Sequence, residues 1–133
     1  LNDLLNKLIL NSKGETNTIQ LKLEVDNLFV NINTAIPLGL LINEVVTNSL
    51  KYAFPNNSEG EIYVKIKPIG NLMFELKIGD NGIGYDHEKT FDTSVSLGFQ
   101  LILSLAEQLN GVINRDLTKK GTHYCLTFEK FNQ

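Results

Sequence analysis

The sequence predicts an α+β domain, a sandwich in which a largely antiparallel sheet carries its helices on one face. Short segments of alternating apolar and polar residues indicate strands with one buried and one wet face. Two longer segments place apolar residues at helical spacing. The predicted order is strands, helix, hairpin, loop, helix, hairpin, and the 133 residues suit one domain.

The first half of the chain supplies two predicted helices and two strands. Apolar residues at helical spacing predict a helix over residues 1–10, which Gly14 ends. Alternation predicts a strand over residues 19–25, and a second short strand is predicted over residues 28–32 after a turn at Asp26-Asn27. The next helix is predicted to begin at Thr34 as N-cap, to tolerate Pro37 in its first turn, and to continue to about Phe54.

The second half contains two predicted hairpins with a helix between them. Residues 62–67 and 72–78 alternate on either side of Gly70-Asn71 and predict the first hairpin. Residues 80–96 lack periodicity and predict a loop, and residues 97–109 predict an amphipathic helix closed by Asn110-Gly111. Residues 112–117 and 123–128 predict the second hairpin.

Composition and charge exclude several classes of protein. Apolar residues make up 42% and charged residues 20% of the chain, which is ordinary for a globular domain. The net charge of -3 argues against a nucleic-acid-binding module. Cys125 is the single cysteine, so no internal disulfide forms, and we expect a reducing, cytoplasmic setting. No apolar run approaches the ~20 residues that span a bilayer, so we expect no membrane contact. Because the chain starts at Leu1 within a helical pattern, we expect a fragment of a longer protein.

A polar stripe on the long central helix is the first candidate site. Asn43, Glu44, Thr47, Asn48 and Lys51 fall within an arc of roughly 140° at helical periodicity. A solvated face would explain the stripe, but asparagine is a poor helix former. Glu44 and Asn48 are four residues apart, so their oxygens lie on one face and suit a hard cation such as Mg²⁺ or an oriented water. Lys51 could contact phosphate oxygens.

The stretch Asp80-Asn81-Gly82-Ile83-Gly84 is the second candidate site. Gly82 and Gly84 lack Cβ atoms, so their backbone can approach a flat ligand closely. Asp80, at a strand end, could accept a hydrogen bond from an exocyclic amine. A plain turn is the alternative, because Asp-Asn-Gly is a common turn sequence.

Two smaller clusters follow, and other motifs are missing. Residues 96–101 begin a helix with a glycine, which is typical of a phosphate site or of a simple N-cap. Gly121-Thr122 precedes a strand. The chain has no complete dinucleotide, calcium or GxxxxGK[ST] motif. His87, His123 and Cys125 are poorly spaced for zinc, and His123 and Cys125 are expected to be half-buried packing residues.

The order of the four clusters resembles that of the GHKL ATPase superfamily. Residues 43–54 look like its N-box, residues 80–84 like its G1 box DxGxG, residues 96–101 like its G2 box, and Gly121-Thr122 like its closing GT. Within the superfamily, residues 35–40 and 51–55 are most similar to the catalytic domain of sensor histidine kinases. The resemblance covers residues 19–130 and implies a Bergerat fold, a two-layer sandwich with a mixed, mostly antiparallel sheet.

The resemblance also implies bound ATP and Mg²⁺. Asn48 would hold Mg²⁺, and Glu44 would polarise or position the attacking group. Asp80 would bind the adenine amino group, and Thr122 would support it through a water. Residues 85–96 would form the lid over ATP. The remaining ATP-binding residues implied by the resemblance are Lys51, Tyr52, Gly82, Gly84, Leu97 and Gly98.

The resemblance implies a division into residues 1–13, the end of a dimerisation and phosphotransfer helix, and residues 14–133, the ATP-binding catalytic domain. The γ-phosphoryl of ATP would pass to a histidine on upstream dimerisation helices and then to a response regulator, in a protein that is a homodimer at full length. Neither His87 nor His123 lies in a helix that resembles such an acceptor. Two alternatives stay open: another GHKL ATPase or serine kinase, and a nonenzymatic nucleotide-binding module.

Overall fold

The computed structural model describes residues 19–25, 28–55, 59–84 and 93–130. The predicted helix over residues 1–10 and most of the predicted lid lie outside these ranges. The described elements in chain order are β1 (Ile19–Val25), α2 (Ile32–Asn48), a π-helix η1 (Ser49–Ala53), β2 (Gly60–Ile69), β3 (Met73–Asp80), α3 (Thr93–Gln108), β4 (Val112–Arg115) and β5 (His123–Glu129).

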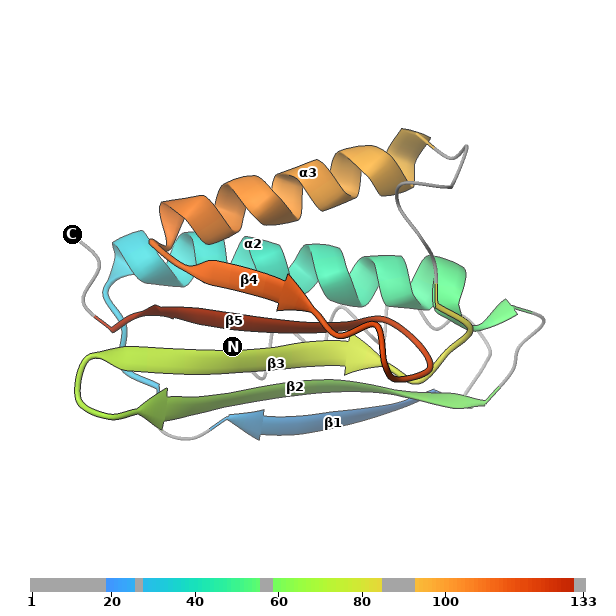
Figure 1. Ribbon diagram of the computed structural model, residues 1–133, viewed down its shortest axis with the longest axis horizontal. Coiled ribbons are helices and arrows are strands. Elements are labelled where there is room, and N and C mark those ends of the chain that lie inside the picture. Colours follow the sequence, from blue (N-terminus) through green and yellow to red (C-terminus); the bar gives the residue numbers. More distant parts are fainter. Residues whose placement is uncertain (1–18, 26–27, 56–58, 85–92, 131–133) are drawn as a thin grey trace.

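The five strands form one mixed sheet in the order β1-β2-β3-β5-β4. β1 pairs with β2 in parallel, and the other three pairs are antiparallel. Figure 1 shows α2 and α3 together on one side of this sheet. The predicted α+β sandwich with a mixed, mostly antiparallel sheet and helices on one face is therefore confirmed.

The hydrophobic core lies between the sheet and the two helices. Strand residues alternate between this core and the uncovered face, as in β2, where Ile62, Val64 and Ile66 are buried. α2 contributes Leu41, Ile42 and other residues that are fully shielded from water. The opposite face of the sheet carries ion pairs such as Lys67–Glu75. The strand alternation read from the sequence therefore identifies the covered face correctly.

The start of α2 differs from the sequence prediction. Thr34 is wrong as the N-cap, because the helix begins at Ile32 and Asn31 caps it. Asn31 Oδ1 accepts a hydrogen bond of 3.0 Å from the Thr34 amide, which asparagine does at least as well as threonine. The predicted strand over residues 28–32 is also wrong, because residues 28–31 have no regular structure.

Three other boundaries move. α2 ends at Asn48, and the remainder of the predicted helix is the wider π-helix through Ala53. α3 begins at Thr93, earlier than the predicted residue 97, and β4 ends at Arg115.

Within the described ranges, none of the helices combines the length and apolar character needed to cross a bilayer.

Candidate functional site

Asp80 is the centre of the site, at the last residue of β3, and is fully buried. Its Oδ1 accepts hydrogen bonds from the amides of Gly82, at 2.9 Å, and Thr122, at 3.3 Å. Its Oδ2 accepts a hydrogen bond of 2.5 Å from Ser49 Oγ. A carboxylate has about four acceptor positions. Three protein donors therefore hold Asp80 rigidly and leave room for roughly one more donor.

Ser49 reaches Asp80 because the helix changes its winding at this residue. The Ser49 amide bonds to the carbonyls of both Val45 and Val46, and the π-helix starts here. Such widened turns are frequent at functional sites. Ser49 is fully buried although it follows the polar stripe. Sequence reasoning assigned it no role; its position beside Asn48 in the N-box was the available signal.

β5 and the turn before it close the site from the other side. The Asp80 amide donates a hydrogen bond of 2.9 Å to the Thr122 carbonyl. Gly121 has a φ of 100°, and a Cβ there would overlap the Asp80 carbonyl. The Thr122 hydroxyl is buried and has no hydrogen-bond partner. A buried hydroxyl without a partner is costly in a folded protein, so this atom suits a ligand or a bridging water.

The two glycines of the second cluster lie against the protein's own backbone. The Ile83 amide bonds to the Ala53 carbonyl at 2.9 Å, and a Cβ at Gly82 would overlap that same carbonyl. Gly84 has a φ of 76°, which favours glycine. Gly82 is therefore required for packing against the π-helix. Its predicted contact with adenine stays a prediction.

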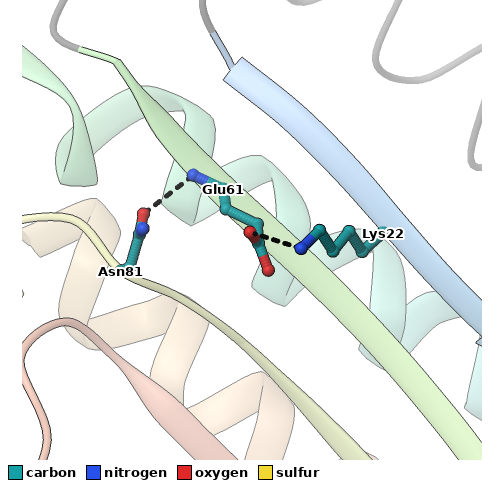
Figure 2. A network of polar contacts seen from close by, with 3 residues as sticks. All are labelled: Lys22, Glu61 and Asn81. Carbon is teal, nitrogen blue, oxygen red and sulfur yellow. Dashed lines mark hydrogen bonds and ion pairs between the residues drawn. The ribbon is translucent and has the colours of Figure 1, made fainter.

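Asn81 fastens this loop to the neighbouring strand (Figure 2). Its side-chain Oδ1 accepts a hydrogen bond of 2.7 Å from the backbone amide of Glu61, and its backbone amide donates one of 3.2 Å to the Glu61 carbonyl. Glu61 Oε2 in turn lies 3.1 Å from Lys22 Nζ. The loop after Asp80 is thereby connected to both β2 and β1, which sequence reasoning did not foresee.

A second group of side chains joins the polar stripe to α3. A Cβ placed on Gly98 would overlap Glu44 Oε1 and lie 3.0 Å from Asn48 Nδ2. Asn48 is only 5% exposed, and Glu44 is half-buried. The structure therefore brings together Glu44, Asn48 and Gly98, three of the predicted site residues. Because Asn48 directly precedes Ser49, this group adjoins the one around Asp80.

The donor chemistry of this second group suits magnesium. Glu44 and Asn48 offer carboxylate and amide oxygens, which Mg²⁺ prefers, and Mg²⁺ commonly takes one or two protein ligands plus phosphates and water. In the part of the chain that the structure describes, no three His, Cys, Asp or Glu side chains gather closely enough to hold a metal ion. A magnesium ion here would thus depend on phosphate oxygens as well.

The other predicted site residues lie on the same elements. Lys51 is exposed and Tyr52 half-buried on the π-helix, and Leu97 is 65% exposed on α3. Their contacts with phosphate stay predictions. His123 is more than a packing residue, because both ring nitrogens lie within hydrogen-bond distance of Tyr63 Oη and the Lys120 carbonyl.

Residues 33–132 match the family of histidine kinase-, DNA gyrase B- and HSP90-like ATPases. This match covers most of the chain, and the chain therefore belongs to that family. Blue-light-activated histidine kinase 2 of Erythrobacter litoralis is 26% identical over 104 residues, which is 78% of this chain and 30% of that protein. The sensor histidine kinase PdtaS of Mycobacterium tuberculosis is 28% identical over 69% of this chain and 19% of its own length.

Solved structures of histidine kinases share the fold. The histidine kinase domain of the Erythrobacter litoralis EL346 blue-light-activated kinase superposes with a TM-score of 0.81 at 21% identity, over 94% of this chain and 57% of that one. The mycobacterial sensor histidine kinase MprB gives a TM-score of 0.72 at 18% identity, over 99% of this chain and 97% of that one. The chain thus spans less than a third of the curated relatives above but nearly all of the latter structure.

Proposed function

We propose that this chain is the ATP-binding catalytic domain of a two-component sensor histidine kinase. The observation that carries the proposal is that the group around Asp80 and the group around Glu44 meet at two consecutive residues, Asn48 and Ser49. Ser49 bonds to the buried Asp80 carboxylate, and Asn48 and Glu44 lie where a Cβ on Gly98 would meet them. One group suits a purine and the other suits magnesium-bound phosphates. Membership of the ATPase family and the likeness to histidine kinases support this assignment.

The adenine end would be recognised by hydrogen bonds at the end of β3. Asp80 has about one acceptor position left, which suits the exocyclic amine of adenine. The Thr122 hydroxyl would hold a water against the same base. Guanine presents a carbonyl oxygen in place of that amine, and a carboxylate rejects it. This arrangement would select ATP over GTP.

The phosphate end would be organised by α2 and α3. Asn48 would present its amide oxygen to Mg²⁺. Gly98 leaves open the space in which any larger side chain would overlap Glu44. Bound Mg²⁺ would neutralise phosphate charge. Glu44 would polarise or orient the attacking imidazole, and Lys51, Tyr52 and Leu97 would line the path of the phosphates. Phosphoryl transfer depends mainly on such positioning and charge neutralisation.

The acceptor would come from outside this domain. We propose that upstream dimerisation helices carry the phosphoacceptor histidine, that residues 1–13 are the end of these helices, and that the full-length protein is a homodimer. A response regulator would receive the phosphoryl group. The reduced thiol of Cys125 suits the cytoplasm, where we place the domain.

Nucleotide binding tests the site. Asn48→Ala should abolish Mg²⁺-dependent ATP binding, and Asp80→Ala should erase the preference for ATP over GTP, both measured by calorimetry with the fold checked by circular dichroism. Asn114→Ala, at an exposed position of β4, is the matched control and should bind ATP normally. Unchanged binding in both site variants would place the pocket elsewhere.

Phosphoryl transfer tests the class of protein. The chain extended by its natural upstream helices should form an acid-labile, base-stable phosphate from ATP, and Glu44→Gln should slow its formation. An extended chain that binds ATP but forms no phosphohistidine would instead support a nucleotide-binding module. Phosphate on an added serine-containing partner would support a serine kinase.

A further inference from the structure

Tyr63 and His123 form a pair on the uncovered face of the sheet. They lie on β2 and β5, which flank β3. Their rings stack with centroids 5.6 Å apart, and Tyr63 Oη lies 2.6 Å from His123 Nδ1. Gly79 lies beneath them, where a Cβ would overlap the Thr122 carbonyl and come within 3.0 Å of Tyr63 Oη. The pair therefore exists because β3 has no side chain at this position.

The direction of both hydrogen bonds can be assigned. His123 Nε2 lies 2.7 Å from the Lys120 carbonyl, which can only accept, so Nε2 carries the hydrogen. In a neutral imidazole Nδ1 then accepts from the Tyr63 hydroxyl. Burial, followed by the charge of Asp80, raises the pKa of Tyr63 to about 12, so the hydroxyl stays a donor at neutral pH. The result is a series of two hydrogen bonds, from Tyr63 on β2 to His123 and from His123 to the Lys120 carbonyl.

These two hydrogen bonds end on the turn that borders the proposed adenine site. Lys120 precedes Gly121 and Thr122, which lie against the Asp80 backbone. At the other side of the turn, the Asp116 amide donates a hydrogen bond of 2.9 Å to the His123 carbonyl. His123 thus holds the turn by its carbonyl and by its ring.

We propose that Tyr63 and His123 are positioning residues for the adenine half of the site, because they fix where the turn places the Thr122 hydroxyl relative to Asp80. The inference rests on the proposed function. Neither residue touches the nucleotide, since both lie on the far face of the sheet. A hydrogen bond to the base is sensitive to small displacements, so holding this turn would affect affinity.

Tyr63→Phe tests the inference with little risk to the fold, because it keeps the stacked ring and removes only the hydroxyl. We expect MgATP binding by the 133-residue chain to weaken about five-fold, the size of one lost hydrogen bond. The matched control is Thr127→Val, which removes a hydroxyl from β5 about 13 Å along the strand from His123 and should bind normally. Thermal unfolding of each variant reports any loss of stability.

A double-mutant cycle separates positioning from general weakening. In a Thr122→Val background the hydroxyl that the pair positions is gone, so Tyr63→Phe should reduce MgATP affinity by less than two-fold. An independent readout is the imidazole ¹⁵N spectrum: His123 should be the Nε2–H tautomer, and Tyr63→Phe should shift it toward a mixture. Substituting His87, the second of the two histidines, assigns the signals.

The outcomes distinguish this inference from the function on which it rests. Wild-type affinity in Tyr63→Phe, or an equal loss in both backgrounds, would overturn the positioning role while Asp80→Ala still loses its preference for ATP over GTP. Unchanged nucleotide binding in both Asn48→Ala and Asp80→Ala would overturn the proposed function and this inference with it.

Discussion

Replacing Ser49 with alanine tests the coupling between α2 and the end of β3. The substitution removes the 2.5 Å hydrogen bond from Ser49 Oγ to Asp80 and leaves the rest of the buried site in place. A hydrogen bond to a charged group contributes about 1.5–3 kcal/mol, and the higher helix propensity of alanine offsets about 0.5 kcal/mol. We therefore expect a net loss of about 2 kcal/mol in the free energy of unfolding. In a domain of 133 residues this corresponds to about 7 °C in Tm.

Urea unfolding followed by circular dichroism measures this loss. Ser104→Ala is the matched control, because Ser104 is exposed within α3. It should change the stability by less than about 0.5 kcal/mol. A loss in Ser49→Ala below about 0.5 kcal/mol, or one equal to that of the control, would show that Asp80 does not depend on this bond.

Three further expectations concern a glycine, a tyrosine and the cysteine. Gly121→Ala should lower the free energy of unfolding in urea by more than about 2 kcal/mol, because φ is positive and the added Cβ would overlap Asp80. The control Gly70→Ala also has a positive φ but open space around the added Cβ, so it should lose only about 1 kcal/mol. The raised pKa of Tyr63 stabilises the fold fully below pH 10, and this contribution disappears as the pH rises through about 12. Absorbance at 295 nm should accordingly show a phenolate titrating near pH 12 that is missing in Tyr63→Phe. Burial, and secondly the charge of Glu75, raises the pKa of Cys125. At pH 8 the alkylation of Cys125 by iodoacetamide should therefore be slower than that of a free thiol, and faster in Glu75→Gln than in the wild type. Equal rates in the wild type, in Glu75→Gln and in a free thiol would contradict this account.

The sheet and its covered face could be predicted because period-two alternation carries that information locally. Ile62, Val64 and Ile66 repeat every second residue, and all three are buried. The prediction of a strand failed at residues 28–32, where Leu28, Phe29 and Val30 are consecutive apolar residues and do not alternate with polar ones. There the capping strength of Asn31 decides the structure and begins a helix instead.

The contacts within the site were only partly predictable. The motif order assigned Glu44, Asn48 and Gly98 to one predicted site, and the structure brings these three residues together. The bond from Ser49 to Asp80 depends on a change from α- to π-helix, which amphipathic spacing does not reveal. Asn81 was part of a recognised motif, but its bonds to Glu61 depend on the antiparallel pairing of two strands, which no local pattern states.

The two halves of the site differ in how the fold holds them, and the difference suits their proposed tasks. Asp80 is fully buried and fixed by three donors from three segments of the chain, so the atoms that would recognise the base are already in place. Glu44 is half-buried on the helix face that continues to the exposed Lys51, where an acceptor from another domain could approach. A rigid base site joined to an accessible phosphate site at Asn48 and Ser49 would let the domain hold its nucleotide before any acceptor arrives.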